Sequence, residues 1–252
     1  MSLPPPAPDR AAVVTGASSG IGAAIVRALA ARDWHCVLVA RREGRLRELA
    51  DDVGGEYEVC DVTDRNGLAA VASRHPRVNL LVNNAGIPGR ANFLDADPEQ
   101  IERVMRTNYL GSIWSLRAFL PALEAAAPSD VVNVVSVAGT VALPASGPYA
   151  ASKHAQLAFS RATAVQLRRR GVRVHTVKPG FVETDGFPQS WLPRPAQRLV
   201  IGPAQVAAHV VASVERGRGE TTVPRYYGVA GVVQALAPNV LSRGMANRIG
   251  TQ

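Results

Sequence analysis

The stretch Ala11-Ala12-Val13-Val14-Thr15-Gly16-Ala17-Ser18-Ser19-Gly20-Ile21-Gly22 decides the fold of this 252-residue chain. Its first five residues form a short apolar run typical of a buried strand, and a helical pattern follows at residues 21–32. The three glycines permit a tight turn and a close approach to the backbone. Because the free N–H groups and the dipole at a helix start attract anions, the stretch predicts a pyrophosphate-binding strand, turn and helix.

The same alternation of short apolar runs and longer amphipathic segments continues along the chain. Several runs are rich in valine without polar alternation, as expected for parallel strands covered on both faces. The pattern predicts an α/β fold: a three-layer, doubly wound Rossmann fold around a parallel sheet of about seven strands. The expected strands are residues 11–15, 35–40, 57–60, 79–83, 130–136, 172–178 and 221–223. The expected helices are residues 21–32, 43–52, 64–74, 98–126, 149–170 and 203–216.

We find no repeat and no interdomain linker, so residues 1–252 are expected to form a single domain. The proline-rich residues 1–9 are expected to be flexible and resemble neither a signal nor a transit peptide. Residues 180–201, rich in proline and aromatic side chains, are expected to form a substrate lid. Residues 224–252 form a C-terminal extension. Its uncharged part, 226–241, is interpreted as a cover for the pocket or a subunit interface, with contact to a membrane surface as the alternative.

Composition excludes several classes of protein. The chain is 47% hydrophobic and 19% charged, which excludes global disorder, and no run is long enough to cross a bilayer. The two cysteines and five histidines show no disulfide framework and no metal spacing, so no metal is expected. A reducing, cytoplasmic setting is the simplest interpretation.

The net charge of +8 raises the hypothesis of a nucleic-acid partner. Of the 28 basic residues 26 are arginine, and they are scattered; the only lysines are Lys153 and Lys178. Aromatic residues make up 5% of the chain and do not interleave with the basic ones, so no stacking platform for bases is present. A solvated excess of arginine is therefore favoured, and no nucleic-acid partner is expected.

Tyr149 and Lys153 lie four residues apart, so a helix would place them on one face. A phenol with a pKa of about 10 is a poor acid or base at neutral pH, and a nearby cation lowers that pKa. A surface lysine beside a packed tyrosine is the simpler alternative for such a pair. Against it, a chain that otherwise relies on arginine uses lysine here, where a compact ammonium would be needed.

The motifs and their order resemble the short-chain dehydrogenase/reductase family. The turn reads G-x-x-x-G-x-G, Asn83-Asn84-Ala85-Gly86 ends the fourth expected strand, and Ser136 ends the fifth. Tyr149-Ala150-Ala151-Ser152-Lys153 opens the next helix, and Pro179-Gly180 and Thr184 follow the sixth strand. The resemblance covers residues 11–184 and is architectural beyond them.

The resemblance implies roles for four catalytic residues. Tyr149 would donate a proton to a substrate carbonyl, and Lys153 would bind the nicotinamide ribose and lower the tyrosine pKa. Ser136 would hydrogen-bond the substrate oxygen, and Asn108 would hold a water that links the lysine to solvent. The family also implies a homodimer or homotetramer paired through the helices at 98–126 and 149–170.

The cofactor is expected to be NADP(H) rather than NAD(H). No acidic residue ends the second strand; Arg41 and Arg42 stand there and could clamp a 2′-phosphate with help from Ser18. Solvated arginines are the alternative. The resemblance assigns the cofactor to Gly16, Ser18, Ser19, Gly20, Ile21, Gly22, Arg41, Arg42, Asp61, Val62, Asn83, Ala85, Gly86, Tyr149, Lys153, Pro179, Gly180, Val182 and Thr184.

The function that follows is NADPH-dependent reduction of a carbonyl, in a hydrophobic ketone or aldehyde, to an alcohol. The main alternative is an NADP-binding sensor of the same fold that does not turn over substrate. An epimerase or dehydratase of the family's extended branch is disfavoured, because those chains are longer and use a different glycine spacing.

Overall fold

The computed structural model describes residues 10–89, 91–142, 144–185, 197–239 and 243. The expected flexible segment 1–9 lies outside these residues, as do residues 186–196 of the expected lid and most of the chain after residue 239. The part that the structure describes contains the whole predicted sheet and all of the predicted helices.

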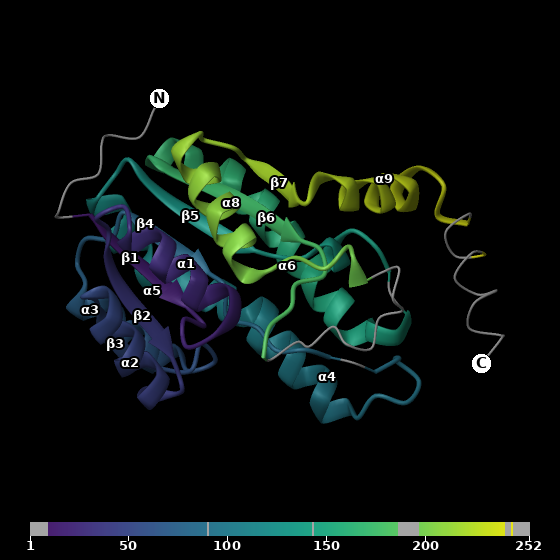
Figure 1. Cartoon of the computed structure of the whole chain (residues 1–252), viewed down its shortest axis with the longest axis horizontal. Coiled ribbons are helices and arrows are strands. Elements are labelled where there is room, and N and C mark those ends of the chain that lie inside the picture. The colour runs from purple at the N-terminus through teal and green to yellow at the C-terminus, as the bar shows by residue number, and fades with distance from the viewer. Residues whose placement is uncertain (1–9, 90, 143, 186–196, 240–242, 244–252) are drawn as a thin grey trace.

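A seven-stranded, all-parallel sheet forms the middle layer, as predicted (Figure 1). The strands follow the spatial order β3-β2-β1-β4-β5-β6-β7. The sheet therefore grows outward from β1 in one direction and from β4 in the other, so the order in which strands are added reverses between these two parallel neighbours. The bounds are β1 Ala11–Thr15, β2 His35–Ala40, β3 Glu56–Val59, β4 Leu80–Asn83, β5 Ser129–Val134, β6 Val172–Pro179 and β7 Glu220–Val223.

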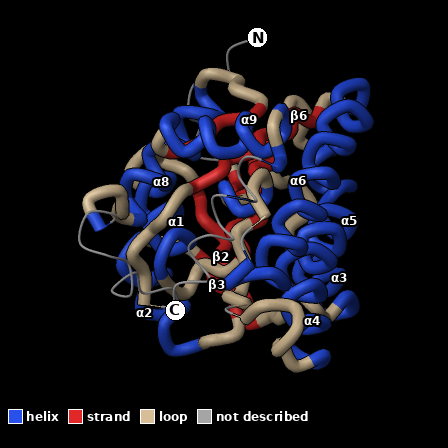
Figure 2. The backbone as a smooth tube through the Cα atoms, turned by 90° about the vertical axis from the view of Figure 1, so that its right-hand side faces the viewer, coloured by secondary structure: helices blue, strands red, loops and turns tan. Residues whose placement is uncertain are grey.

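Helices cover both faces of the sheet (Figure 2). One face packs against α1 (Gly20–Ala30), α2 (Glu43–Val53) and α8 (Pro203–Glu215). The other face packs against α3 (Arg65–Arg74), α5 (Gly111–Ala125) and α6 (Gly147–Leu167). The two sets stand on either side of the red strands in Figure 2, which gives the three layers that the sequence predicts.

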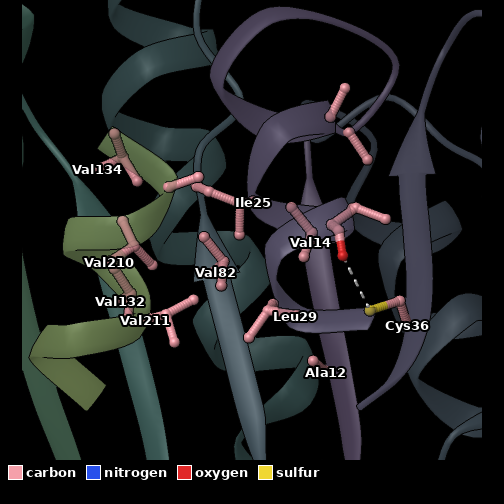
Figure 3. Close-up of a cluster of buried hydrophobic side chains, with 14 of the residues drawn as sticks. Ala12, Val14, Ile25, Leu29, Cys36, Val82, Val132, Val134, Val210 and Val211 are labelled. Carbon is pink, nitrogen blue, oxygen red and sulfur yellow. Dashed lines mark hydrogen bonds between the residues drawn. The ribbon is translucent and has the colours of Figure 1, made fainter. Parts of the chain in front are cut away.

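The core consists of two apolar clusters, one on each face of the sheet. Ala12 and Val14 of β1 point into the cluster that Figure 3 shows, beside Ile25 and Leu29 of α1. Val13, between them in sequence, belongs to the cluster on the opposite face. Since successive strand residues face opposite ways and both faces are covered, an unbroken valine run is the pattern that this sheet requires.

The helix expected at residues 98–126 is broken by a change of geometry. It consists of α4 (Pro98–Met105), a π-helical turn η1 (Arg106–Leu110) and α5. Asn108 lies inside η1 and is completely buried. The wider turn shifts the backbone register around this residue, a feature that is frequent at functional sites and that side-chain periodicity does not reveal.

The C-terminal extension begins with a 3-10 turn η5 (Arg225–Tyr227) and the helix α9 (Gly228–Leu236), which projects to one side in Figure 1. Gly231 packs against Thr140, since a Cβ added there would lie 2.7 Å from its hydroxyl oxygen. On the outer side of α9, Val229, Val232 and Leu236 are exposed. No helix among the described residues is long and apolar enough to span a membrane.

Candidate active site

The candidate site lies at the carboxyl edge of the sheet. There the connections that leave the neighbouring strands β1 and β4 run to helices on opposite faces of the sheet. In open parallel sheets this reversal leaves a crevice between the loops that follow the two strands, and ligands bind there. The glycine turn follows β1, and Asn83-Asn84-Ala85-Gly86 completes and follows β4. The fold thus brings the glycine turn and the Asn83–Gly86 motif together at one edge of the sheet.

The glycine turn requires glycine on steric grounds at two of its positions. Gly16 has a φ of +67°, in the left-handed region. A Cβ on Gly22 would lie 2.2 Å from the Gly16 carbonyl oxygen. The side chain of Ser19 does not cap α1, and its first turn holds no acidic residue. The turn is therefore compact and offers free backbone donors to an anion.

Asn84 and Thr15 stabilise the glycine turn through hydrogen bonds. Neither residue was among the predicted site residues. The Asn84 Nδ2 donates to the carbonyl oxygens of Thr15 (3.0 Å) and Gly16 (3.3 Å). The Thr15 Oγ1 donates to the Val82 carbonyl and accepts from the backbone of Asn84 and Ala85. These bonds join β1 to the loop after β4 and hold the crevice in shape.

Arg42, rather than Arg41, lies against the glycine turn. Its guanidinium donates to the Ser18 hydroxyl from Nε (3.0 Å) and Nη2 (2.8 Å), and Nη2 also donates to Ser19. Burial and the nearby Arg45 and Arg41 lower the pKa of Arg42. Arg41 turns aside to pair with Asp61 at 3.4 Å. A cluster of cations beside two hydroxyls is an arrangement that a phosphate dianion would stabilise.

Asp61 is not used as a helix cap. Asp64 caps α3 by accepting from the backbone of Asn66 and Gly67. Asp61 accepts from the Thr63 amide at 2.9 Å; burial opposes its ionisation, but this bond and Arg41 keep its pKa below the ordinary value. Val62 is buried, with its side chain against Gly111. The Asp61 carboxylate thus lies beside Arg41, just after β3.

Tyr149 and Ser136 meet on the other side of the crevice. Ser136 follows β5, is buried, and accepts from the Ala138 amide at 3.1 Å. The hydroxyls of Ser136 and Tyr149 are hydrogen-bonded to each other. Burial raises the pKa of the Tyr149 phenol, and the bond to Ser136 offsets part of this rise. The phenol is therefore protonated at neutral pH and is positioned to donate its proton.

Lys153 is buried one turn further along α6, with only 4% of its surface exposed. Its Nζ donates to the Val134 carbonyl (3.1 Å) and to Gln156 Oε1 (2.8 Å), and lies 5.8 Å from the centre of the Tyr149 ring. Burial lowers the pKa of this ammonium to about 7. The alternative of a solvated surface lysine is wrong.

Asn108 reaches the same cluster from the π-helical turn. Its side chain exchanges hydrogen bonds with the backbone of Ile87 and donates to Ser152 Oγ at 3.0 Å. Its backbone carbonyl accepts from Ser112 Oγ, which in turn accepts from Gln156. Hydrogen bonds therefore connect the Asn108 backbone carbonyl to Lys153 through Ser112 and Gln156.

The remaining predicted residues divide between the crevice and its support. Thr184 lies against Gly20, where an added Cβ would meet it at 3.1 Å, and Gly86 lies beside the Asn108 carboxamide. Pro179 ends β6, and Gly180 contacts the Tyr227 ring. Val182 is buried in the core. Asn83 is also buried, and its Nδ2 donates to Asn133 Oδ1 at 2.9 Å, which supports the sheet.

The residues fit a nicotinamide dinucleotide. A glycine turn too tight for side chains and a cluster of cations lie on one side of the crevice, and the serine, tyrosine and lysine lie on the other. Among the described residues no group of three or more histidine, cysteine or acidic side chains could hold a metal ion.

The profile of the short chain dehydrogenase family matches residues 10–192. The chain is a short-chain dehydrogenase. As an oxidoreductase of this family, it uses a nicotinamide cofactor.

Curated relatives of this short-chain dehydrogenase include an uncharacterized oxidoreductase of Mycobacterium tuberculosis. It is 44% identical over 177 residues, which cover 70% of each chain. Dehydrogenase/reductase SDR family member 7B of Bos taurus is 30% identical over 261 residues, 94% of this chain and 80% of that protein. The Danio rerio protein of the same name is 33% identical over 192 residues, and this alignment spans 62% of its length.

Solved structures of the family share the whole fold. A short chain dehydrogenase from Burkholderia cenocepacia in complex with NADP has a TM-score of 0.83 at 29% identity, covering 92% of this chain and 95% of that one. Actinorhodin polyketide ketoreductase with NADPH has a TM-score of 0.80 at 28% identity, covering 90% and 99%. A Burkholderia phymatum enzyme in complex with NAD has a TM-score of 0.81 at 25% identity, covering 92% and 95%.

The buried Lys153 predicts a pH-dependent stability of the cofactor-free dehydrogenase. Between pH 7 and 9.5 the unfolded chain, with an ordinary lysine pKa of 10.5, holds a proton that the folded protein has begun to release. The free energy of unfolding should therefore rise with pH, by up to about 1.4 kcal/mol per pH unit from this one group. Denaturant unfolding at several pH values should show that Lys153→Met lacks this rise.

Lys178→Met is the matched control, because it removes the other lysine, which pairs with Glu220 at the sheet edge. This variant should keep the wild-type slope. The same slope in Lys153→Met as in the wild type would contradict the assignment of the buried ammonium.

Proposed function

We propose that this short-chain dehydrogenase reduces the carbonyl group of an apolar ketone or aldehyde to an alcohol with NADPH. The observation that carries the proposal is the hydrogen-bonded pair of Ser136 and Tyr149 beside the buried ammonium of Lys153. All three lie at the carboxyl edge of the sheet, across the crevice from the glycine turn. The bound dinucleotide supplies the hydride.

The protein's own groups act on the substrate oxygen. Two hydroxyls that share a hydrogen bond can both turn toward a carbonyl oxygen, which stabilises the negative charge that develops on it. The raised pKa of Tyr149 keeps its proton available for transfer to that oxygen. Lys153 faces the same ring, and its positive charge stabilises the phenolate that remains.

The walls near the site favour an apolar substrate. Phe181, which follows β6, contacts Tyr227 edge to face with ring centres 5.8 Å apart. The Tyr227 hydroxyl donates to the Leu199 carbonyl at 3.1 Å. These contacts join the C-terminal extension to the described ends of the expected lid, residues 180–185 and 197–201. Aromatic rings form part of this surface.

Replacement of Tyr149 by phenylalanine should lower kcat for NADPH-dependent reduction of a ketone panel by about 10²- to 10⁴-fold. Cofactor binding should remain, because the ring and Lys153 stay in place. NADPH consumption gives the rate, and the fluorescence of bound NADPH gives the affinity. Tyr57→Phe, on the distant β3, is the control and should keep full activity. Unchanged turnover in Tyr149→Phe would remove the proposed acid, and NADPH binding without turnover by the wild type would favour the sensor.

NADPH is proposed as the preferred cofactor because Arg42 and Arg41 stand where an NAD-dependent enzyme would present a carboxylate. Relatives of this fold bind NADP, NADPH or NAD, so the preference depends on this chain's own residues. In this proposal Arg42 contacts the 2′-phosphate directly, together with Ser18, and the hydrogen bond between these two side chains supports it. Arg41 supports it from the Asp61 side.

Replacement of Arg42 by alanine should raise KM for NADPH by about 10- to 100-fold, because charge-assisted hydrogen bonds to the phosphate are lost. KM for NADH should change by less than about 3-fold, and Arg41→Ala should show a smaller effect than Arg42→Ala. Arg47→Ala, on the exposed side of α2, is the control. A wild-type enzyme that prefers NADH, or an Arg42→Ala enzyme with unaltered KM values, would contradict this prediction.

A homodimer is proposed through α5 and α6. A groove between these helices is lined by apolar side chains, including Ile113, Leu120 and Phe159. Val165 on α6 is 77% exposed. Exposed apolar surface of this kind is typical of an interface between subunits. The two buried free cysteines agree with the reducing, cytoplasmic setting that we propose.

Ala162→Arg should convert the oligomer to a monomer, because it places a bulky charge in the groove at an exposed position. Light scattering after size-exclusion chromatography measures the mass. Ala70→Arg, exposed on α3, should leave the mass unchanged. A wild-type chain that is monomeric at micromolar concentration, or an Ala162→Arg variant with the wild-type mass, would refute this interface.

A further inference from the structure

Gln156 is a buried polar residue that the proposed chemistry does not yet use. It lies on α6, three residues after Lys153, and none of its surface is exposed. Its Oε1 accepts from Lys153 Nζ at 2.8 Å, and its Nε2 donates to Ser112 Oγ on α5 at 2.8 Å. A buried carboxamide between two helices is expensive to desolvate unless its hydrogen bonds are made, and here both ends are bonded.

The polarity of this chain of bonds is fixed by Ser112. Its single hydroxyl proton is donated to the Asn108 carbonyl at 3.1 Å, in the π-helical turn. The same oxygen must therefore accept from the Gln156 amide. This orientation leaves the carboxamide oxygen, rather than its NH2 group, facing the lysine. A reversed carboxamide would place its NH2 group against the lysine ammonium, donor against donor, and its oxygen against the Ser112 oxygen, acceptor against acceptor.

The electrostatic surroundings of Lys153 make this oxygen important. Among the described residues no ion pair joins the lysine to a carboxylate, and the titratable side chain that its Nζ faces is Tyr149, whose ring centre lies 5.8 Å away. In the described part of the chain, the lysine's hydrogen-bond partner on β5 is the Val134 carbonyl, and Gln156 links the lysine to the uncharged Ser112 and, through Ser112, to the Asn108 carbonyl. The cation is thus held by two neutral oxygens, one of which belongs to Gln156.

We propose that Gln156 is a positioning residue that holds the Lys153 side chain in its charged form and directs it toward Tyr149. It does so as part of a relay of hydrogen bonds from Asn108 through Ser112. Two of the three ammonium N–H groups are bound to Val134 and Gln156, which leaves the third for the cofactor ribose or the phenol. This inference rests on the proposed function only for its effect on turnover; the effect on the lysine itself is independent of it.

The two lysines of the chain make the proposal directly measurable. Labelling with ¹³C-lysine gives two side-chain signals, and Lys178→Arg assigns them. The ¹³Cε shift of Lys153 is followed against pH in the cofactor-free protein. Gln156→Met keeps the volume but removes the acceptor, so the Lys153 midpoint should fall by about one pH unit. Gln156→Glu places a carboxylate at the same point, so the midpoint should rise by about one unit or more.

Thr163→Val is the matched control, because Thr163 is buried on the same helix but donates only to the carbonyls of Phe159 and Ser160. Its Lys153 midpoint should equal that of the wild type. A midpoint within about 0.2 units of the wild type in both Gln156 variants would overturn the proposal. If Gln156→Met does not fold, the midpoint of Gln156→Glu decides alone, since this variant keeps the size and the acceptor.

Turnover separates this inference from the proposed function. With an aryl ketone such as acetophenone and saturating NADPH, Gln156→Met should lower kcat about 10-fold at pH 7.5. The loss should diminish at lower pH, where the lysine regains its proton, and KM for the ketone should change little. A merely structural role would give a loss that does not depend on pH. If the wild type reduces no carbonyl, the proposed function fails, whereas the lysine titration still decides the role of Gln156.

Discussion

The placement of one ammonium group inside the protein constrains much of the structure around the site. Lys153 is buried where β5 ends, without a carboxylate partner among the described residues, so its charge depends on oxygens that the fold brings to it. One of these oxygens comes from the strand and the other from its own helix. The helix must therefore pack in one register against β5, and the same register places Tyr149 against Ser136. The position of Tyr149 therefore follows from the hydrogen bonds that the buried Lys153 ammonium requires.

The π-helical turn belongs to the same constraint. Asn108 lies inside this turn and presents its side chain to the Ile87 backbone and its backbone carbonyl to Ser112. The Asn108 side chain therefore holds the loop after β4. Its backbone carbonyl is linked through Ser112 and Gln156 to α6, the helix that carries Lys153. The crevice between the cofactor side and the tyrosine side is therefore bridged by short, buried hydrogen bonds. Such a connection favours a site whose geometry exists before the ligand arrives.

The fold and the central pair of residues were predictable from the sequence, because local pattern determines them. Strands buried on both faces leave valine runs, and a tyrosine and a lysine four residues apart share a helix face whatever surrounds them. The finer assignments were not predictable. Arg41 and Arg42 are adjacent and chemically identical, and only the packing of α2 shows that Arg42 reaches the serines. Asn84 bonds to Thr15, 69 residues away, and Gln156 bonds to Ser112, 44 residues away, and no local spacing reveals such contacts.

The attachment of the C-terminal extension affects how this protein could be altered. Gly180 leaves room for the Tyr227 ring and could not carry a side chain, and the hydroxyls of Tyr226 and Tyr227 both donate to Leu199. The segment at 180–201 and the start of the C-terminal extension therefore have complementary surfaces that pack against each other. Exchanging either segment alone with that of a homologue would pair mismatched surfaces. To change the substrate specificity of this protein, the segment at 180–201 and the C-terminal extension should be exchanged together.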